Sequence, residues 1–138
     1  MKGTILSVDD EHDANELVRF HLTKAGFEVS QAFTGREALE MIASARPDLV
    51  LLDLMLPDID GFGVCEILRR HPSTATIPIM ILSAWATTDS GGLGLELGAL
   101  DILKKPYSPA LLVERVKRFL SLRIPQASGS ATCLSSSE

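Results

Sequence analysis

The stretch DLVLLDLMLPDIDG, residues 48–61, decides the fold of this chain. Its first half is a nearly continuous apolar run, which is typical of a parallel β-strand covered on both faces. The run also contains Asp53, and a carboxylate is costly to bury unless it is paired, bound to a metal or neutralised. The stretch therefore predicts a buried strand with an acidic group whose charge must be balanced by neighbours.

Strands and helices alternate outward from this stretch. The predicted strands span residues 4–8, 27–32, 48–54, 77–84 and 101–104. Apolar residues recur at helical spacing in residues 12–25, 35–45, 61–71 and 109–121. Thr34 and Glu37 have the spacing of a capping box, and Ser108 before Pro109 predicts the start of the last helix. This alternation predicts βαβ units and an α/β fold with a five-stranded, parallel, doubly wound sheet.

Two segments differ from this pattern. Residues 88–99 should form the fourth helix but contain Gly91, Gly92 and Gly94, and each interior glycine costs about 1 kcal/mol relative to alanine. We therefore expect a short, late or mobile helix there. Residues 124–138 are rich in serine and lack periodicity, which predicts a disordered tail or linker stub after a domain spanning residues 1–123.

Composition suggests the setting in which the chain works. The formal net charge is −5 and no dense basic run is present, which predicts no direct binding to nucleic acid. There are only two cysteines, no cleavable leader and no stretch long enough to span a bilayer. These features predict a cytoplasmic protein that does not contact a membrane.

Polar side chains gather where the predicted strands end. Parallel strands deliver their carboxyl ends to one edge of the sheet, where such folds bind ligands. The residues expected at that edge are Asp9, Asp10, Asp53, Ser83, Lys104 and Lys105. Carboxylates without histidine or cysteine suit Mg²⁺. A carboxylate can also attack phosphorus to form an aspartyl phosphate, with a cation and a lysine neutralising the phosphoryl oxygens.

These motifs together resemble the receiver domain of two-component response regulators. The matching segments are residues 5–11, 47–61, 77–84, 94–107 and the final amphipathic helix, which together cover about residues 3–122. The resemblance implies a flavodoxin-like sheet with strand order 2-1-3-4-5. It also implies that a histidine kinase or phosphotransfer histidine donates a phosphoryl group, altering a surface that binds an effector protein or a fused output domain. A monomer or a phosphorylation-linked dimer is expected.

The resemblance also assigns roles to individual residues. It identifies Asp53 as the phosphoacceptor and Asp9 and Asp10 as the acidic pair for Mg²⁺, with Asp10 the more direct ligand. The backbone carbonyl of Met55 would complete the protein ligands. Ser83 would follow the phosphoryl group. Lys105 would neutralise the phosphoryl group, with a cis bond before Pro106, and Lys104 would point elsewhere.

Three positions depart from the family pattern. Ile102 stands where the family often has the aromatic residue that reports phosphorylation. We therefore hypothesise that phosphorylation orders the glycine-rich helix instead. Met55 and Trp85 offer no group that would orient a hydrolytic water, which predicts slow self-dephosphorylation. The domain would assist its own phosphorylation but would not be a turnover enzyme.

Two alternatives stay open. A haloacid-dehalogenase-type phosphatase also uses an aspartyl phosphate, but it needs a carboxylate where this chain has Met55, and a cap domain. A pseudo-receiver would keep the fold and act as a phosphorylation-independent interaction module. The joint presence of Asp10, Asp53, Ser83 and Lys105 argues against the second alternative.

Overall fold

The strands form one parallel sheet in the computed structural model, which describes residues 3–83 and 101–123. The order across the sheet is β2-β1-β3-β4-β5. The strands are β1 (Thr4–Val8), β2 (Glu28–Ala32), β3 (Leu49–Leu52), β4 (Ile79–Ser83) and β5 (Asp101–Lys104). The predicted doubly wound, flavodoxin-like sheet with order 2-1-3-4-5 is confirmed.

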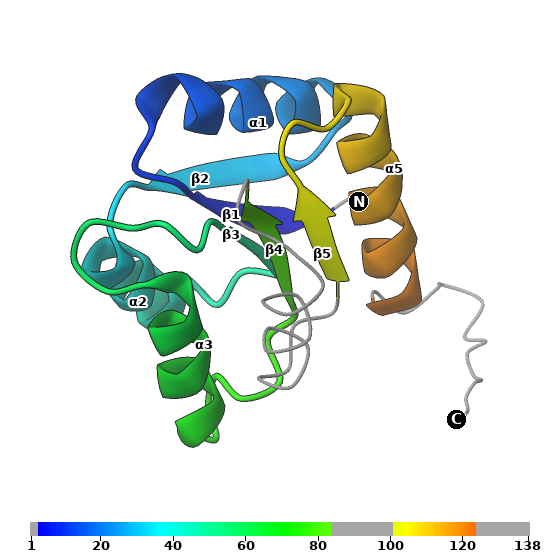
Figure 1. Cartoon of the computed structure of the whole chain (residues 1–138). Coiled ribbons are helices and arrows are strands. Elements are labelled where there is room, and N and C mark those ends of the chain that lie inside the picture. Colours follow the sequence, from blue (N-terminus) through cyan, green and yellow to red (C-terminus); the bar gives the residue numbers. More distant parts are fainter. Residues whose placement is uncertain (1–2, 84–100, 124–138) are drawn as a thin grey trace.

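Helices cover both faces of this sheet. As Figure 1 shows, α1 (His12–Lys24) and α5 (Pro109–Arg123) lie on one face, and α2 (Gly35–Ala45) and α3 (Gly61–Arg70) lie on the other. The predicted helix at 88–99, with its three glycines, lies outside the described residues. Trp85 and the predicted tail at 124–138 do too. The division at residue 123 therefore stays a prediction.

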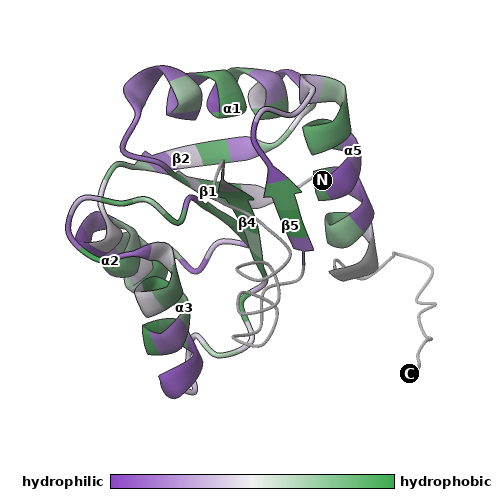
Figure 2. Ribbon diagram, viewed as in Figure 1, coloured by the Kyte–Doolittle hydropathy of each residue, from purple (hydrophilic) through white to green (hydrophobic). Residues whose placement is uncertain are grey.

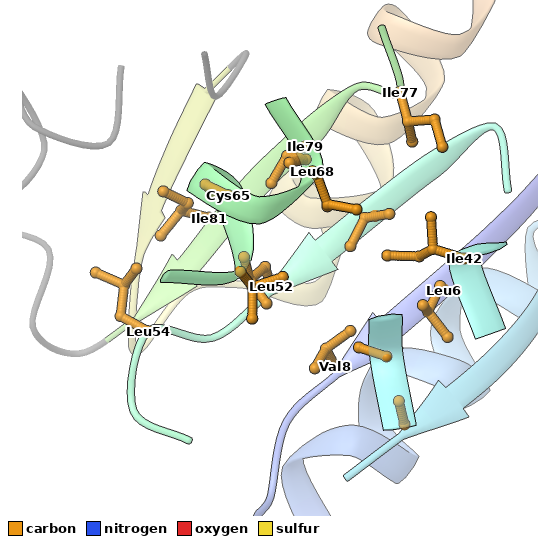
Figure 3. Packing of buried hydrophobic residues seen from close by; sticks show 14 residues of the cluster. Leu6, Val8, Ile42, Leu52, Leu54, Cys65, Leu68, Ile77, Ile79 and Ile81 are labelled. Atoms are coloured by element: carbon orange, nitrogen blue, oxygen red, sulfur yellow. The ribbon is translucent and has the colours of Figure 1, made fainter. Parts of the chain in front are cut away.

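Alternate residues of the central strands build two separate cores. On the α2 and α3 face, strand residues pack with helix residues, and ten members of this cluster are labelled in Figure 3: Leu6, Val8, Ile42, Leu52, Leu54, Cys65, Leu68, Ile77, Ile79 and Ile81. On the α1 and α5 face the cluster includes Ile5, Val18, Leu22, Leu49, Leu51, Met80, Leu112 and Val116. Both faces of the central strands are thus apolar and covered, which explains why their sequences do not alternate with polar residues.

The surfaces of the helices are mixed, as expected for elements that bury one face. Figure 2 shows hydrophilic and hydrophobic residues side by side along α1, α2, α3 and α5. Cys65 lies on the buried stripe of α3, and burial raises the pKa of its thiol to about 11. Within residues 3–83 and 101–123, no helix combines the length and apolarity needed to cross a membrane.

Side-chain caps fix two of the helix starts where the sequence predicts them. Thr34 Oγ1 accepts a hydrogen bond from the Glu37 N–H at 3.0 Å, and Glu37 reaches back to the Phe33 N–H at 2.8 Å. Ser108 Oγ accepts from the Leu111 N–H at 3.0 Å. The strand predicted over 48–54 ends earlier, at Leu52. Asp53 therefore lies just beyond the strand, where the chain is free to turn.

Candidate functional site

Backbone pairing continues one residue past the strands and carries two aspartates to the carboxyl edge of the sheet. The Asp53 N–H donates to the Val8 carbonyl at 3.0 Å, and the Asp9 N–H donates to the Ala32 carbonyl at 3.1 Å. Asp9 and Asp53 consequently stand on adjacent strand ends. Lys105 directly follows β5, which is the edge strand at the opposite end of the sheet from β2. The fold thus brings together side chains that are far apart in the sequence.

Lys105 forms a bridge between the two aspartates. Its Nζ lies 2.7 Å from Asp9 Oδ2 and 3.2 Å from Asp53 Oδ2. Asp9 and Asp53 are only 5% and 7% exposed, so their charges are poorly screened by water. Two buried carboxylates that share one cation are stable side by side only if the cation contacts both of them. The lysine predicted from the sequence therefore does neutralise Asp53.

Burial and pairing act in opposite directions on these groups. Burial raises the pKa of Asp9, although the hydrogen bond from Lys105 and the Glu11 N–H oppose this effect. Burial also disfavours the charged form of Lys105, but the hydrogen bond to Asp9 and the charges of Asp9 and Asp53 outweigh it and raise the pKa of Lys105. Lys105 therefore stays charged at neutral pH.

Asp10 completes an acidic cluster with Asp9 and Asp53. One carboxylate oxygen of each lies within 4.8 Å of the others, and Asp10 is the exposed member. Backbone amides orient the two buried carboxylates: Glu11 N–H donates to Asp9 Oδ1 at 3.0 Å, and Met55 N–H donates to Asp53 Oδ1 at 3.1 Å. A set of hard oxygen donors that carries more negative than positive charge fits a divalent cation such as Mg²⁺.

Among the remaining predicted residues, the structure describes the side chains of some but only the backbone of Ser83. Ser83 ends β4 and its backbone is paired with Lys104, but its side chain lies outside the described part. Lys104 is exposed, whereas the side chain of Lys105 points to the aspartates. The peptide bond between Lys105 and Pro106 is cis, as the resemblance implied. Ile102 is partly buried and packs against the core on the α2 and α3 face.

One supporting residue was missed in the sequence. Asn15 is fully buried in α1, and its Nδ2 donates to the backbone carbonyls of Asp9 and Ala32, both at 3.0 Å. It therefore ties together the ends of β1 and β2 beside the acidic cluster. The signal was present, because Asn15 shares the buried stripe of its helix with Val18 and Leu22. A polar residue on such a stripe needs hydrogen-bond partners.

Gly61 allows the backbone after β3 to fold back on itself. Its N–H donates to the Leu54 carbonyl at 2.9 Å, and a Cβ there would lie 2.7 Å from Leu54 Cα and 2.8 Å from the Asp53 carbonyl oxygen. Both contacts are with backbone atoms, which cannot rotate away. The absence of a side chain at Gly61 is thus a requirement of the loop that carries Asp53.

We expect Gly61→Ala to lower the free energy of unfolding by about 2 kcal/mol through this overpacking. Urea denaturation measures the change. Gly63→Ala is the matched control, because its Cβ would meet a side-chain methyl, Ile59 Cγ2, at 3.0 Å and no backbone atom, and alanine favours the helix by about 1 kcal/mol. Equal stability of the two variants would contradict the close approach.

Comparisons with known proteins show the family of this chain. The family model of the response regulator receiver domain matches residues 5–117. The transcriptional regulatory protein PhoP of Bacillus subtilis, named for alkaline phosphatase synthesis, is 42% identical over 120 residues, which are 87% of this chain and 49% of PhoP. A solved putative response regulator from Chloroflexus aurantiacus is 41% identical, with a TM-score of 0.82, covering 88% of this chain and 99% of that one. The chemotaxis response regulator CheY4 of Vibrio cholerae is 31% identical with the same TM-score, covering 87% and 100%.

One prediction is contradicted by these comparisons, namely that the protein does not bind nucleic acid directly. RpaA of Synechocystis, 41% identical over 89% of this chain, is named a DNA-binding dual master transcriptional regulator. The prediction rested on the charge of these residues alone. This chain spans about half the length of the curated relatives it matches, with 52% of RpaA and 49% of PhoP covered. The charge of the matched half carries no information about the rest of such a protein.

The fold and the matches therefore agree. The family model covers residues 5–117, and two relatives are more than 40% identical, which is sufficient to assign the family. The chain belongs to the response regulator receiver domain family of two-component signal transduction.

Proposed function

We propose that this chain accepts a phosphoryl group on Asp53 from a histidine kinase or a phosphotransfer histidine, with Mg²⁺ bound, and that the acyl phosphate alters a partner-binding surface. The observation that carries the proposal is the position of Lys105, whose ammonium contacts both Asp9 and Asp53. Phosphoryl transfer requires mainly positioning and neutralisation of oxygen charge, and this arrangement supplies both.

The residues would divide the chemistry as follows. Asp53 forms the new oxygen–phosphorus bond while the phosphorus–nitrogen bond of the donor breaks, and the imidazole keeps that electron pair. The Met55 N–H orients the nucleophilic carboxylate from one side and Lys105 from the other. Asp9, Asp10, Asp53 and the Met55 carbonyl would hold Mg²⁺, which when bound neutralises phosphoryl oxygens.

A protein donor is favoured by the surface next to the site. A cavity of about 420 Å³ is lined by residues of α1 and the segment after β5, among them Leu17, Lys105, Pro106 and Tyr107. Leu17 and Phe20 on α1 are exposed although they are large and apolar. Exposed apolar side chains beside a reactive group mark a contact surface for another macromolecule. We propose that the donor rests there.

Met55 and the lysine-bridged aspartates favour this proposal over its alternatives. A haloacid-dehalogenase-type phosphatase would require a carboxylate at Met55, whose side chain is exposed and apolar. A pseudo-receiver would not require a partly buried lysine between two buried aspartates. The domain would thus be a phosphoacceptor that assists its own phosphorylation and the slow hydrolysis of its acyl phosphate. It would not turn over a separate substrate.

Intact mass spectrometry tests the proposal directly. After incubation with acetyl phosphate and Mg²⁺, we expect one added phosphoryl group per chain, stable in acid and lost in base. Chelation of Mg²⁺ with EDTA should abolish the addition, because the acidic cluster repels the incoming phosphoryl oxygens. No adduct, or an equal yield in EDTA, would overturn the proposal.

A further inference from the structure

A carboxylate outside the acidic cluster joins the loop after β3 to the start of α2. Asp58 Oδ1 accepts a hydrogen bond from the Gly35 N–H at 2.8 Å, and Asp58 Oδ2 accepts from the Arg36 N–H at 2.9 Å. The partners are 23 and 22 positions away in the sequence. Asp58 therefore connects two separate elements at the same edge of the domain.

These bonds satisfy donors that would otherwise lack partners. The first four N–H groups of a helix have no partner within the helix. In α2, Thr34 accepts from Glu37 through Oγ1 and from Ala38 through its carbonyl, which leaves the Gly35 and Arg36 N–H groups for Asp58. A charged acceptor at a helix N-terminus is favoured by the helix dipole. Consistently, the bonds to Arg36 and Gly35 lower the pKa of Asp58.

The loop attached in this way is the one that carries the reactive aspartate. It runs from Asp53 to Asp60, which caps α3 by accepting from the Gly63 N–H at 2.7 Å. Its two ends are joined by the bond from the Gly61 N–H to the Leu54 carbonyl. Between these fixed ends, Asp58 holds the outermost part of the loop to α2 through a charge-assisted pair of bonds.

Asp58 does not belong to the acidic cluster. Within the described residues, the carboxylates whose oxygens cluster are those of Asp9, Asp10 and Asp53. Asp58 instead directs both of its oxygens at backbone amides of α2. Apart from the direct effect of its charge, Asp58 can act on metal binding only through the backbone of the loop, which includes Met55.

We infer that Asp58 is a positioning residue for the metal site: its carboxylate anchors the loop after β3 to the start of α2 and so fixes the Met55 backbone that Mg²⁺ binding uses. The inference rests on the function proposed above. Groups that orient metal ligands from outside typically account for about 10-fold in metal affinity or more. Loss of the anchor should thus weaken Mg²⁺ binding while leaving every carboxylate ligand in place.

Calorimetric titration with Mg²⁺ tests the inference in the full chain, with three variants. Asp58→Ala removes both bonds and should raise the Mg²⁺ dissociation constant about 10-fold. Asp58→Asn keeps one acceptor oxygen and should fall between Asp58→Ala and the wild type. Thr34→Ala is the matched control, because it removes a cap from the same helix end without touching the loop. It should stay within about twofold of the wild type while losing a similar amount of stability in urea.

The outcomes separate the inference from the proposed function. Asp58→Ala and Asp58→Asn lose the same charge, so weaker Mg²⁺ binding in Asp58→Ala than in Asp58→Asn, with no weakening in Thr34→Ala, supports a positioning role. If Asp58→Ala binds as tightly as the wild type, or if Thr34→Ala is weakened equally, the inference alone is overturned. Wild-type protein that binds no Mg²⁺ would overturn the proposed metal site, and the inference with it. Circular dichroism of each variant confirms that folded protein is compared.

Discussion

Asp53→Asn is expected to gain no phosphoryl group under conditions in which the wild type is fully modified. An amide is not a nucleophile toward phosphorus at neutral pH, whereas the carboxylate is. The change is otherwise small, because asparagine keeps the Oδ1 acceptor for the Met55 N–H and Lys105 keeps its bond to Asp9. The loss of phosphorylation should therefore be complete, while the remaining bonds keep the variant folded.

Intact mass after acetyl phosphate and Mg²⁺ measures this loss, and urea denaturation checks that the variant is folded. The other aspartates of the cluster act as an internal control. Asp9 is oriented by the Glu11 N–H and Lys105 much as Asp53 is oriented by Met55 and Lys105. A phosphoryl group found on Asp9 in the variant, located by peptide mapping, would show that the choice of Asp53 is wrong.

Lys105→Met is expected to lose both stability and reactivity. The substitution preserves the length of the apolar stem but leaves Asp9 and Asp53, both buried, without a cation. Breaking a fully buried pair costs roughly 3 to 5 kcal/mol, and the partial exposure of Lys105 reduces this to about 2 kcal/mol. Addition of Mg²⁺ should restore part of the stability, since binding to the native state alone stabilises it.

The pH dependence of this variant follows from the shifted pKa values. Burial raises the pKa of Asp9 above its ordinary 3.8, so the native state binds more protons than the unfolded state and stability falls as the pH rises above 3.8. Without Lys105 this fall is steeper. The raised pKa of Lys105 itself means that its contribution is complete below 10.5 and is lost as the pH rises through its folded pKa. The difference between variant and wild type should therefore be largest near neutral pH.

Urea denaturation at several pH values, with and without Mg²⁺, measures these differences. Lys104→Met is the matched control, because the neighbouring lysine is exposed and should contribute within about 0.5 kcal/mol. Intact mass gives the rate of phosphorylation for both. A Lys105→Met variant as stable as Lys104→Met at neutral pH would show that the bridge between the aspartates contributes nothing to the fold.

The fold could be predicted because its signal repeats along the chain. Apolar strands such as residues 49–52 require cover on both faces, and only alternating helices on a parallel sheet supply it. The ends of the predicted strands then place Asp9, Asp53 and Lys105 at one edge of the sheet. The limits of the strands are harder to predict than the strands themselves. Asp53, for example, continues the backbone pairing of β3 although the strand ends at Leu52.

The supporting residues were harder to predict, because their partners are set by packing between elements. The bonds of Asp58 reach a helix more than 20 positions earlier, and no local pattern encodes that distance. Asn15 was visible in principle as a polar residue on a buried stripe, but not the two carbonyls that it binds. The prediction about nucleic acid failed for a different reason, since net charge describes only the residues that contribute to it.

The bridge between Lys105 and Asp9 joins residues 96 positions apart. During synthesis on the ribosome, Asp9 is therefore made well before Lys105. A nascent chain that has not yet added β5 therefore has its acidic residues but lacks the cation that neutralises them. If Asp53 is the phosphoacceptor proposed above, such incomplete chains should be poor phosphoryl acceptors until Lys105 has been added.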